Sequence, residues 1–177
     1  MRIIAGAHKG RLLKTPTWPG VRPTSDRLRE TLFNILANRV PGARVLDAYA
    51  GTGAVALEAL SRGAASAVCV EQDRRAQVLI AENRARLAAE EQCMILRADA
   101  RRAFDAPIAG GPFEIVFLDP PYDDKGLDEL VQAAAEQRAA GGVLVLEHAS
   151  RRPPPALHGR PPHRSVKAGD STLSFYL

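Results

Sequence analysis

The sequence contains only two cysteines, Cys69 and Cys93, and neither has a Cys-x-x-Cys partner or a histidine at ligand spacing. Both lie in apolar stretches, so we expect buried, reduced thiols rather than a disulfide framework or a zinc site. The histidines are also scattered without metal-ligand spacing; they are His8, His148, His158 and His163. We therefore expect no bound metal.

Long apolar runs are absent as well. No stretch approaches the roughly 18 apolar residues that a membrane span requires. Residues 1–6 turn polar before the apolar run of a signal peptide could form. We therefore expect a cytoplasmic protein with no membrane partner.

Charge is plentiful but unevenly distributed. Residues 1–44 contain nine basic and two acidic residues, residues 45–150 contain ten and seventeen, and residues 151–177 contain five and one. A basic arm on a compact domain is expected of a protein that neutralises phosphates. The alternative is a merely solvated surface, because only Trp18 and Phe33 place aromatic rings in the basic arm.

From Arg44 onward, apolar runs of strand length alternate with stretches rich in helix-forming residues. The expected strands are Arg44–Asp47, Ala67–Glu71, Met94–Arg97, Glu114–Leu118 and Val143–Glu147. The expected helices between them are Ala54–Ser61, Arg74–Glu90, Ala100–Phe104 and Gly126–Ala140. This alternation is typical of βαβ units, and it predicts an α/β fold in which helices cover both faces of a mostly parallel sheet.

The C-terminal end adds a hairpin to this pattern. Residues 165–167 and 172–177 flank a turn at Ala168-Gly169-Asp170 and predict two antiparallel strands. The expected sheet therefore has seven strands.

The N-terminal end is expected to form a basic extension, residues 1–43, ahead of the main domain, residues 44–177. Residues 2–5 and 11–14 predict a small β-hairpin. A helix is expected from Arg27 to about Asn38, with a cap chosen from Thr24, Ser25 and Asp26.

A glycine-rich turn follows the first expected strand. Gly51 and Gly53 allow the backbone to bend sharply and to approach a ligand at the start of the next helix. The run from Gly51 to Ala56 also matches the dinucleotide pattern GxGxxA, so the glycines alone suit a nicotinamide enzyme as well as a methyltransferase. Asp47 favours a cationic ligand, because its carboxylate would repel a pyrophosphate.

Two further acids end the next expected strands. Glu71 lies twenty residues beyond Gly51, where a carboxylate can accept hydrogen bonds from both hydroxyls of a ribose. Asp99 follows the third strand and could accept a hydrogen bond from an adenine amino group. The spacing therefore indicates a cofactor that contains adenosine, although a solvent-facing acid is the alternative at each position.

The fourth expected strand ends in Asp119-Pro120-Pro121-Tyr122. The amino nitrogen of a base is a poor nucleophile, because its lone pair is delocalised into the ring, so catalysis depends on geometry. Asp119 and the carbonyl of Pro120 can each accept one amino hydrogen bond, and Tyr122 offers a face on which the base stacks. Asp119 can also take the proton after transfer. The alternative is a simple strand-terminating turn.

These motifs together resemble a class I methyltransferase of the Asp/Asn-Pro-Pro-Tyr amino group. Further segments are similar to the bacterial 16S ribosomal RNA guanine-N2 methyltransferases, and the resemblance covers nearly the whole chain. These segments are residues 1–6, 9–13, 22–36 and 57–64. The resemblance implies a Rossmann-like fold, S-adenosylmethionine as cofactor, and a guanine of 16S rRNA within a small-subunit particle as substrate. We expect the protein to act as a monomer.

The resemblance also implies roles for individual residues. Asp119 to Tyr122 would hold the guanine. The expected cofactor-binding residues are Asp47, Tyr49, Gly51, Gly53, Glu71, Gln72, Asp99 and Ala100. The expected RNA-binding residues are His8, Lys9, Arg11, Arg22 and Arg27. Arg22, Thr24 and Arg27 could serve the RNA or the carboxylate of the cofactor.

Three alternatives remain open from the sequence. An adenine-N6 methyltransferase that acts on DNA or another RNA would use the same chemistry, although the chain has no evident target-recognition domain. A nicotinamide-dependent oxidoreductase would use the glycine turn. A non-catalytic RNA-binding module would use only the basic arm.

Overall fold

The computed structural model of the chain describes residues 1–18 and 25–177. Its helices are α1 (Asp26–Leu36), η1 (Ala37–Arg39), α2 (Ala54–Ser61), α3 (Arg74–Arg86), α4 (Ala100–Ala103) and α5 (Leu127–Ala135). Its strands are β1 (Arg44–Ala48), β2 (Ser66–Glu71), β3 (Cys93–Arg97), β4 (Phe113–Leu118), β5 (Arg138–Ala149), β6 (Arg164–Ala168) and β7 (Ser171–Tyr176).

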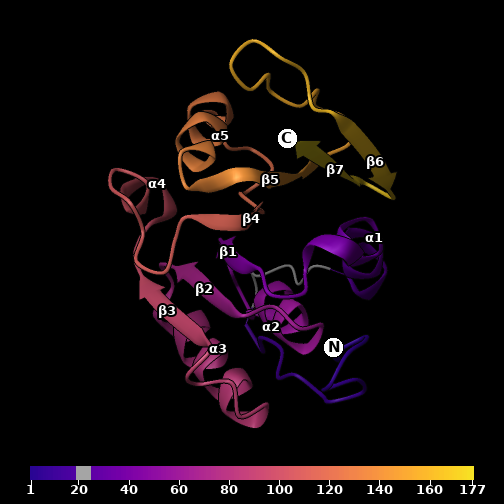
Figure 1. Cartoon of the computed structure of the whole chain (residues 1–177), viewed down its shortest axis with the longest axis vertical. Helices are drawn as coiled ribbons and strands as arrows, with labels where there is room; N and C mark the ends of the chain where they lie inside the picture. Colours follow the sequence, from indigo (N-terminus) through magenta and orange to yellow (C-terminus); the bar gives the residue numbers. More distant parts are fainter. Residues whose placement is uncertain (19–24) are drawn as a thin grey trace.

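The strands of the described residues form one seven-stranded sheet in the order β3-β2-β1-β4-β5-β7-β6 (Figure 1). The strands β1 to β5 pair in parallel, whereas β7 is antiparallel to both β5 and β6. The predicted mostly parallel sheet and its closing hairpin are therefore confirmed. The chain adds strands in one direction from β1 to β3 and in the other from β4 onward, which creates a switch point between β1 and β4.

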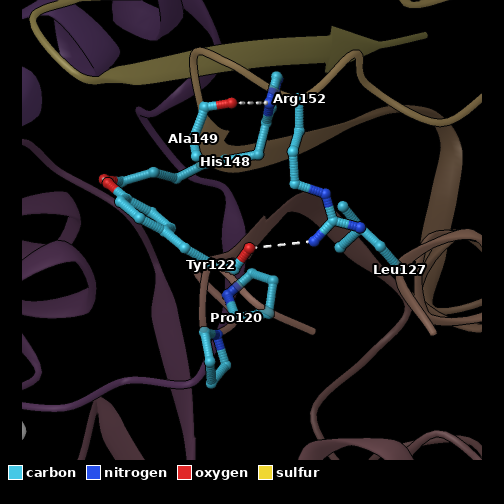
Figure 2. A pocket seen from close by; sticks show the side chains of 8 residues that line it. Pro120, Tyr122, Leu127, His148, Ala149 and Arg152 are labelled. Atoms are coloured by element: carbon cyan, nitrogen blue, oxygen red, sulfur yellow. Dashed lines mark hydrogen bonds between the residues drawn. The ribbon is translucent and has the colours of Figure 1, made fainter. Parts of the chain in front are cut away.

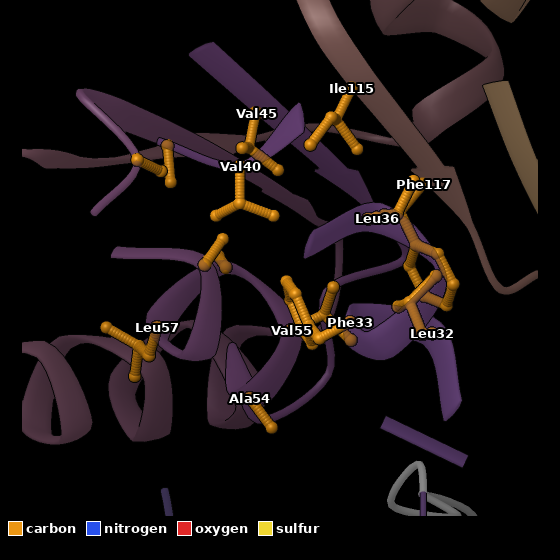
Figure 3. Packing of buried hydrophobic residues seen from close by; sticks show 14 of the residues in the cluster. Leu32, Phe33, Leu36, Val40, Val45, Ala54, Val55, Leu57, Ile115 and Phe117 are labelled. Carbon is orange, nitrogen blue, oxygen red and sulfur yellow. The ribbon is translucent and has the colours of Figure 1, made fainter. Parts of the chain in front are cut away.

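Helices cover both faces of the sheet, as predicted. On one face, apolar side chains of α1 and α2 pack against Val45, Ile115 and Phe117 (Figure 3). On the other face, side chains of α4 and α5 pack with Leu46 and Leu118. Alternate residues of the central strands therefore enter different cores, as expected for parallel strands buried on both sides.

Two helices are shorter than the sequence predicts. The helix α3 ends at Arg86 rather than at Glu90, and Ala88 then adopts a φ of 53°, which a continuing helix does not allow. The helix α5 ends at Ala135 rather than at Ala140. Residues 138–142 instead belong to β5, where Arg138 pairs with Phe113. Sheet pairing therefore overrides the helix propensity of the alanine-rich stretch.

The predicted N-terminal β-hairpin is reduced to an isolated bridge between Arg2 and Leu12. The segment does fold back on itself, because the amide of Ile3 donates to the carbonyl of Arg11 at 2.9 Å. The amides of the next two residues instead donate to the carboxylate of Glu58 in α2, at 2.8 and 3.0 Å. The extension therefore docks on a helix rather than forming a regular ladder.

The predicted N-terminal helix is α1, and its cap is Ser25, whose hydroxyl oxygen accepts a hydrogen bond from the amide of Leu28 at 3.2 Å. Cys69 and Cys93 are buried free thiols, as predicted. Among residues 1–18 and 25–177, no helix combines the length and the apolar character that crossing a membrane requires.

Candidate active site

The glycine turn and the Asp-Pro-Pro-Tyr turn open side by side at the carboxyl edge of the sheet (Figure 1). The strands β1 and β4 are neighbours, and Ala48 at the end of β1 pairs with Leu118 at the end of β4. Tyr49 and Asp119 therefore leave the sheet from adjacent strands. This edge, at the switch point, is where open α/β sheets bind their ligands.

The backbone of the first turn requires its glycines. Gly51 and Gly53 have φ values of 54° and 73°, and Gly53 caps α2. A Cβ on Gly53 would lie 3.1 Å from Cγ2 of Ile80, tighter than most real contacts. Tyr49 also has a positive φ, 67°. The chain thus bends sharply enough to present the start of α2 at the sheet edge.

Asp47 faces the helix that follows the turn. Its side chain is buried, and Oδ2 accepts a hydrogen bond from the amide of Ala56 at 3.1 Å. Burial raises the pKa of this carboxyl to about 7, while the Ala56 amide lowers it and Glu71 raises it. The sequence suggested that Asp47 faces a cationic ligand. In the structure, its observed partner is α2, so its visible effect is to hold the turn.

Glu71 connects the glycine turn to the end of β2. One carboxylate oxygen accepts from the amide of Gly51 at 2.8 Å, and the other accepts from the amide of Asp73 at 2.8 Å. A carboxylate has about four acceptor positions, so these two bonds orient Glu71 and still permit hydroxyl donors to bind. Gln72, the next residue, is exposed.

Asp99 precedes α4 as its N-cap, and its Oδ1 accepts a hydrogen bond from the amide of Arg102 at 3.2 Å. Its observed role is therefore that of a helix cap, while the carboxylate remains half-buried at the sheet edge. Ala100, the first residue of α4, is buried.

Tyr49, in the turn after β1, lies near charged residues that follow β3 and β4. Burial raises the pKa of its phenol to about 12, with Arg101 lowering it and the nearby Asp124 and Asp99 raising it. Arg101 donates from Nη2 to the carboxylate of Asp124 and to the carbonyl of Gly126. The segment after the Asp-Pro-Pro-Tyr turn is thereby fastened to α4.

The Asp-Pro-Pro-Tyr turn is held from its other side by the C-terminal part of the sheet. The phenol of Tyr122 hydrogen-bonds to Oγ of Ser171 at 2.6 Å and lies 3.4 Å from Oε1 of Glu147. Nη1 of Arg152 donates to the carbonyl of Tyr122 at 3.0 Å, as Figure 2 shows, and to the carbonyl of Asp124 at 2.8 Å. Asp119 itself is half-buried. The turn is therefore preorganised by contacts from two other elements.

A small hollow, open in part to solvent, lies next to this turn. Figure 2 shows Pro120 and Tyr122 in the lower part of the view, His148 at the top, and Arg152 and Leu127 at the right. The remaining residues that line it are Pro121, Glu147 and Ala149.

Sequence reasoning missed Glu147, Arg152 and Ser171. Glu147 was detectable from the sequence, because it is the acid that ends an expected apolar strand, as Asp47 and Glu71 are. No sequence signal marks Arg152 or Ser171, because their contacts with Tyr122 span 30 and 49 residues.

The predicted RNA-binding residues are dispersed. Lys9 and Arg11 are exposed in a loop whose neighbour His8 donates from its amide to Oγ of Ser61, the last residue of α2, at 3.0 Å. The glycine turn precedes the first residue of that helix, so this loop lies at the opposite end of α2. Arg27 is exposed on α1. Arg22 and Thr24 lie outside the described residues.

In the described parts of the chain, no group of three or more His, Cys, Asp or Glu side chains is placed to hold a metal ion.

Known proteins resemble this chain along its length. "Ribosomal RNA small subunit methyltransferase D" of Escherichia coli is 45% identical over 131 residues, 74% of this chain and 65% of that protein. The matched region thus spans just under two thirds of that relative. "Putative rRNA methyltransferase YlbH" of Bacillus subtilis is 36% identical, over 84% of this chain and 82% of that protein.

A solved structure shares the fold and most of its length. "Putative methyltransferase yhhF" from Escherichia coli superposes with a TM-score of 0.84 at 34% identity, covering 99% of this chain and 96% of that one. The family described as "conserved hypothetical protein 95" matches residues 1–177. The chain has the Rossmann-like methyltransferase fold, and it belongs to the conserved hypothetical protein 95 family.

Proposed function

We propose that the chain transfers a methyl group from S-adenosylmethionine to the exocyclic N2 of a guanine in 16S rRNA. The observation that carries this proposal is the pairing of Ala48 with Leu118, which opens the glycine turn beside the Asp-Pro-Pro-Tyr turn. The names of the relatives in Escherichia coli and Bacillus subtilis support a ribosomal RNA substrate.

The residues at the carboxyl edge fit the cofactor. Gly51 and Gly53 let the backbone approach it, and Glu71 is oriented to accept the ribose hydroxyls. Asp99 and Tyr49 border the adenine side, together with Gln72 and Ala100. Asp47 supports the turn from beneath. When bound, S-adenosylmethionine supplies an electrophilic methyl carbon, and its sulfur leaves as a neutral thioether.

The Asp-Pro-Pro-Tyr turn positions the nucleophile. Asp119 and the carbonyl of Pro120 accept hydrogen bonds from the two N2 hydrogens, which directs the nitrogen lone pair at the methyl carbon. Tyr122 stacks on the base, and the two prolines keep the backbone rigid. The proton lost from N2 passes to Asp119 and then to water. Holding the geometry is the main contribution of these residues.

The basic residues of the extension, residues 1–43, supply the RNA contact in this proposal. Lys9, Arg11 and Arg27 are exposed and would neutralise phosphates, with His8 beside them. Arg22 is included from the sequence alone. The substrate is 16S rRNA within a small-subunit particle, and the protein acts as a monomer on it.

The test is methyl transfer with nucleoside analysis. The purified protein is incubated with S-adenosylmethionine and small-subunit particles from a strain that lacks it, and the RNA is analysed by mass spectrometry. We expect one N2-methylguanosine per particle, and a rate loss of roughly 10²- to 10⁴-fold for Asp119→Ala. N6-methyladenosine instead, or tight NAD binding without methyl transfer, would overturn the proposal. Undiminished transfer by Asp119→Ala would remove the catalytic role of that residue.

A further inference from the structure

Two acids end adjacent strands at the candidate active site. In the register of β4 and β5, Leu118 pairs with Leu146. The next residues along the two strands are Asp119 and Glu147. Because parallel strands lie about 4.8 Å apart, the two residues project from neighbouring positions. The sequence places them 28 residues apart, so only the sheet reveals this pairing.

The side chain of Glu147 lies on the α1 side of the sheet, next to the phenol of Tyr122. Leu146 belongs to the core on the α5 side, whereas Val145 belongs to the core on the α1 side. Since side chains alternate along a strand, Glu147 points toward the α1 side. Its side chain is 4% exposed, and Oε1 lies 3.4 Å from the phenol of Tyr122. A buried carboxylate therefore borders the ring on which a base would stack.

Guanine and adenine differ in the hydrogen atoms that they present here. Guanine carries three neighbouring N–H hydrogens, one on N1 and two on N2. Adenine carries two on its amino nitrogen, while its N1 is an acceptor. Asp119 and the carbonyl of Pro120 satisfy two amino hydrogens of either base. A third acceptor beside these two would find a donor only in guanine, the hydrogen on N1.

We propose that Glu147 selects guanine over adenine by accepting a hydrogen bond from N1–H of the target base, an inference that rests on the proposed function. The carboxylate can accept hydrogen bonds from the phenol of Tyr122 and from N1–H of the base at the same time, because each carboxylate oxygen accepts more than one hydrogen bond. With adenine, the buried carboxylate would face the lone pair of N1. A buried acceptor that meets a lone pair in place of a donor rejects the wrong substrate strongly.

The test replaces the target guanine by 2-aminopurine, which keeps the N2 amino group but has an acceptor at N1. Small-subunit particles are reconstituted with RNA that carries either base at the methylated nucleotide, and kcat/KM is measured for each. We expect the wild-type protein to prefer guanine by roughly 10- to 100-fold. In Glu147→Gln, the amide can donate to N1 of 2-aminopurine, so the preference should fall at least tenfold.

Two further variants give the comparison its controls. Tyr122→Phe removes the phenol but leaves Glu147, so the rate should fall while the guanine preference persists. Glu147→Asp keeps the charge but withdraws it by one methylene, so the preference should weaken even if Glu147→Gln does not fold. Affinity for S-adenosylhomocysteine, measured by calorimetry, should be unchanged in all folded variants.

The outcomes separate the two proposals. If wild-type protein methylates guanine and 2-aminopurine equally, or if both Glu147 variants keep the wild-type preference, the role of Glu147 is wrong while the proposed function stands. If wild-type protein leaves the N2 of guanine unmodified in every particle, the proposed function itself fails.

Discussion

The carboxylate of Glu71, the last residue of β2, accepts a hydrogen bond from the amide of Gly51 at 2.8 Å. This contact joins the turn after β1 to the neighbouring strand. The acid that is proposed to bind the ribose thus also shapes the loop that receives the rest of the cofactor, so both parts of the cofactor site depend on one side chain.

Glu71→Gln should weaken the binding of S-adenosylhomocysteine about tenfold, because the NH2 group that replaces one carboxylate oxygen cannot accept a hydrogen bond from the amide of Gly51 or Asp73, and a neutral oxygen binds a ribose hydroxyl less strongly. Isothermal titration calorimetry gives the dissociation constant. Glu82→Gln on α3 is the matched control, because it removes an exposed acid paired with Lys14 at 2.8 Å. Equal affinities for the two variants would contradict the role of Glu71.

The pH dependence of stability should reveal Asp47. Its pKa rises on folding from 3.8 to about 7, mainly because of burial. Between these values the folded state holds a proton that the unfolded state has lost, so the free energy of unfolding falls as pH rises. We expect the wild-type value to drop by about 2–4 kcal/mol relative to Asp47→Asn between pH 4 and pH 8. Urea unfolding at each pH measures both proteins, and parallel pH profiles would show that Asp47 ionises normally.

Glu58 should be essential for stability. It is fully buried in α2, accepts hydrogen bonds from the extension and from Arg62 at 2.7 Å, and lies 3.6 Å from the buried guanidinium of Arg29. Glu58→Gln removes the buried counter-charge of that guanidinium and leaves only the half-exposed carboxylate of Asp26, 2.6 Å away, so we expect a loss of about 3 kcal/mol. Glu114→Gln, which breaks a more exposed pair with Arg44, should cost less than about 1 kcal/mol. A similar small loss for both variants in denaturant unfolding would refute this expectation.

Gly6 should tolerate no side chain. A Cβ at this position would lie 1.8 Å from the carbonyl oxygen of Ser61, and the φ of 85° already favours glycine. Gly6→Ala should therefore release the extension from α2 and expose residues 1–14 to limited proteolysis. Gly10→Ala is the control, because its φ of 83° is similar but nothing lies within 4 Å of a Cβ there. Equal protease resistance of both variants would mean that the close approach to Ser61 is unimportant.

Charge reversal in the basic loop should affect only RNA. Lys9→Glu combined with Arg11→Glu removes two exposed cations at the far end of α2 from the glycine turn. We expect weaker binding to RNA of any sequence and a shallower salt dependence, by about two counterions. Fluorescence anisotropy at several salt concentrations measures both. A loss of cofactor affinity with unchanged RNA binding would argue against this surface.

Local patterns predicted most of the fold. Helix α2 begins at Ala54 and ends at Ser61, as expected, because a glycine turn and Gly63 punctuate a run of good helix formers. The five parallel strands and the closing hairpin also follow from alternating apolar runs. The main error is the predicted hairpin in the N-terminal extension. The amides of Ile4 and Ala5 donate to the carboxylate of Glu58 in α2 instead, and the hydrophobic pattern of the sequence does not indicate this contact.

The sequence by itself determined where the candidate site residues lie along the chain, because a glycine turn, strand-end acids and an Asp-Pro-Pro-Tyr turn are encoded within short segments whose conformations depend on near neighbours. Only the tertiary structure decided which residues meet. The neighbours of Asp119 and Tyr122 include Glu147 and Ser171 because β4, β5 and β7 are adjacent in the sheet. Strand adjacency depends on burying both faces of the whole sheet at once, and a local pattern does not contain that free energy.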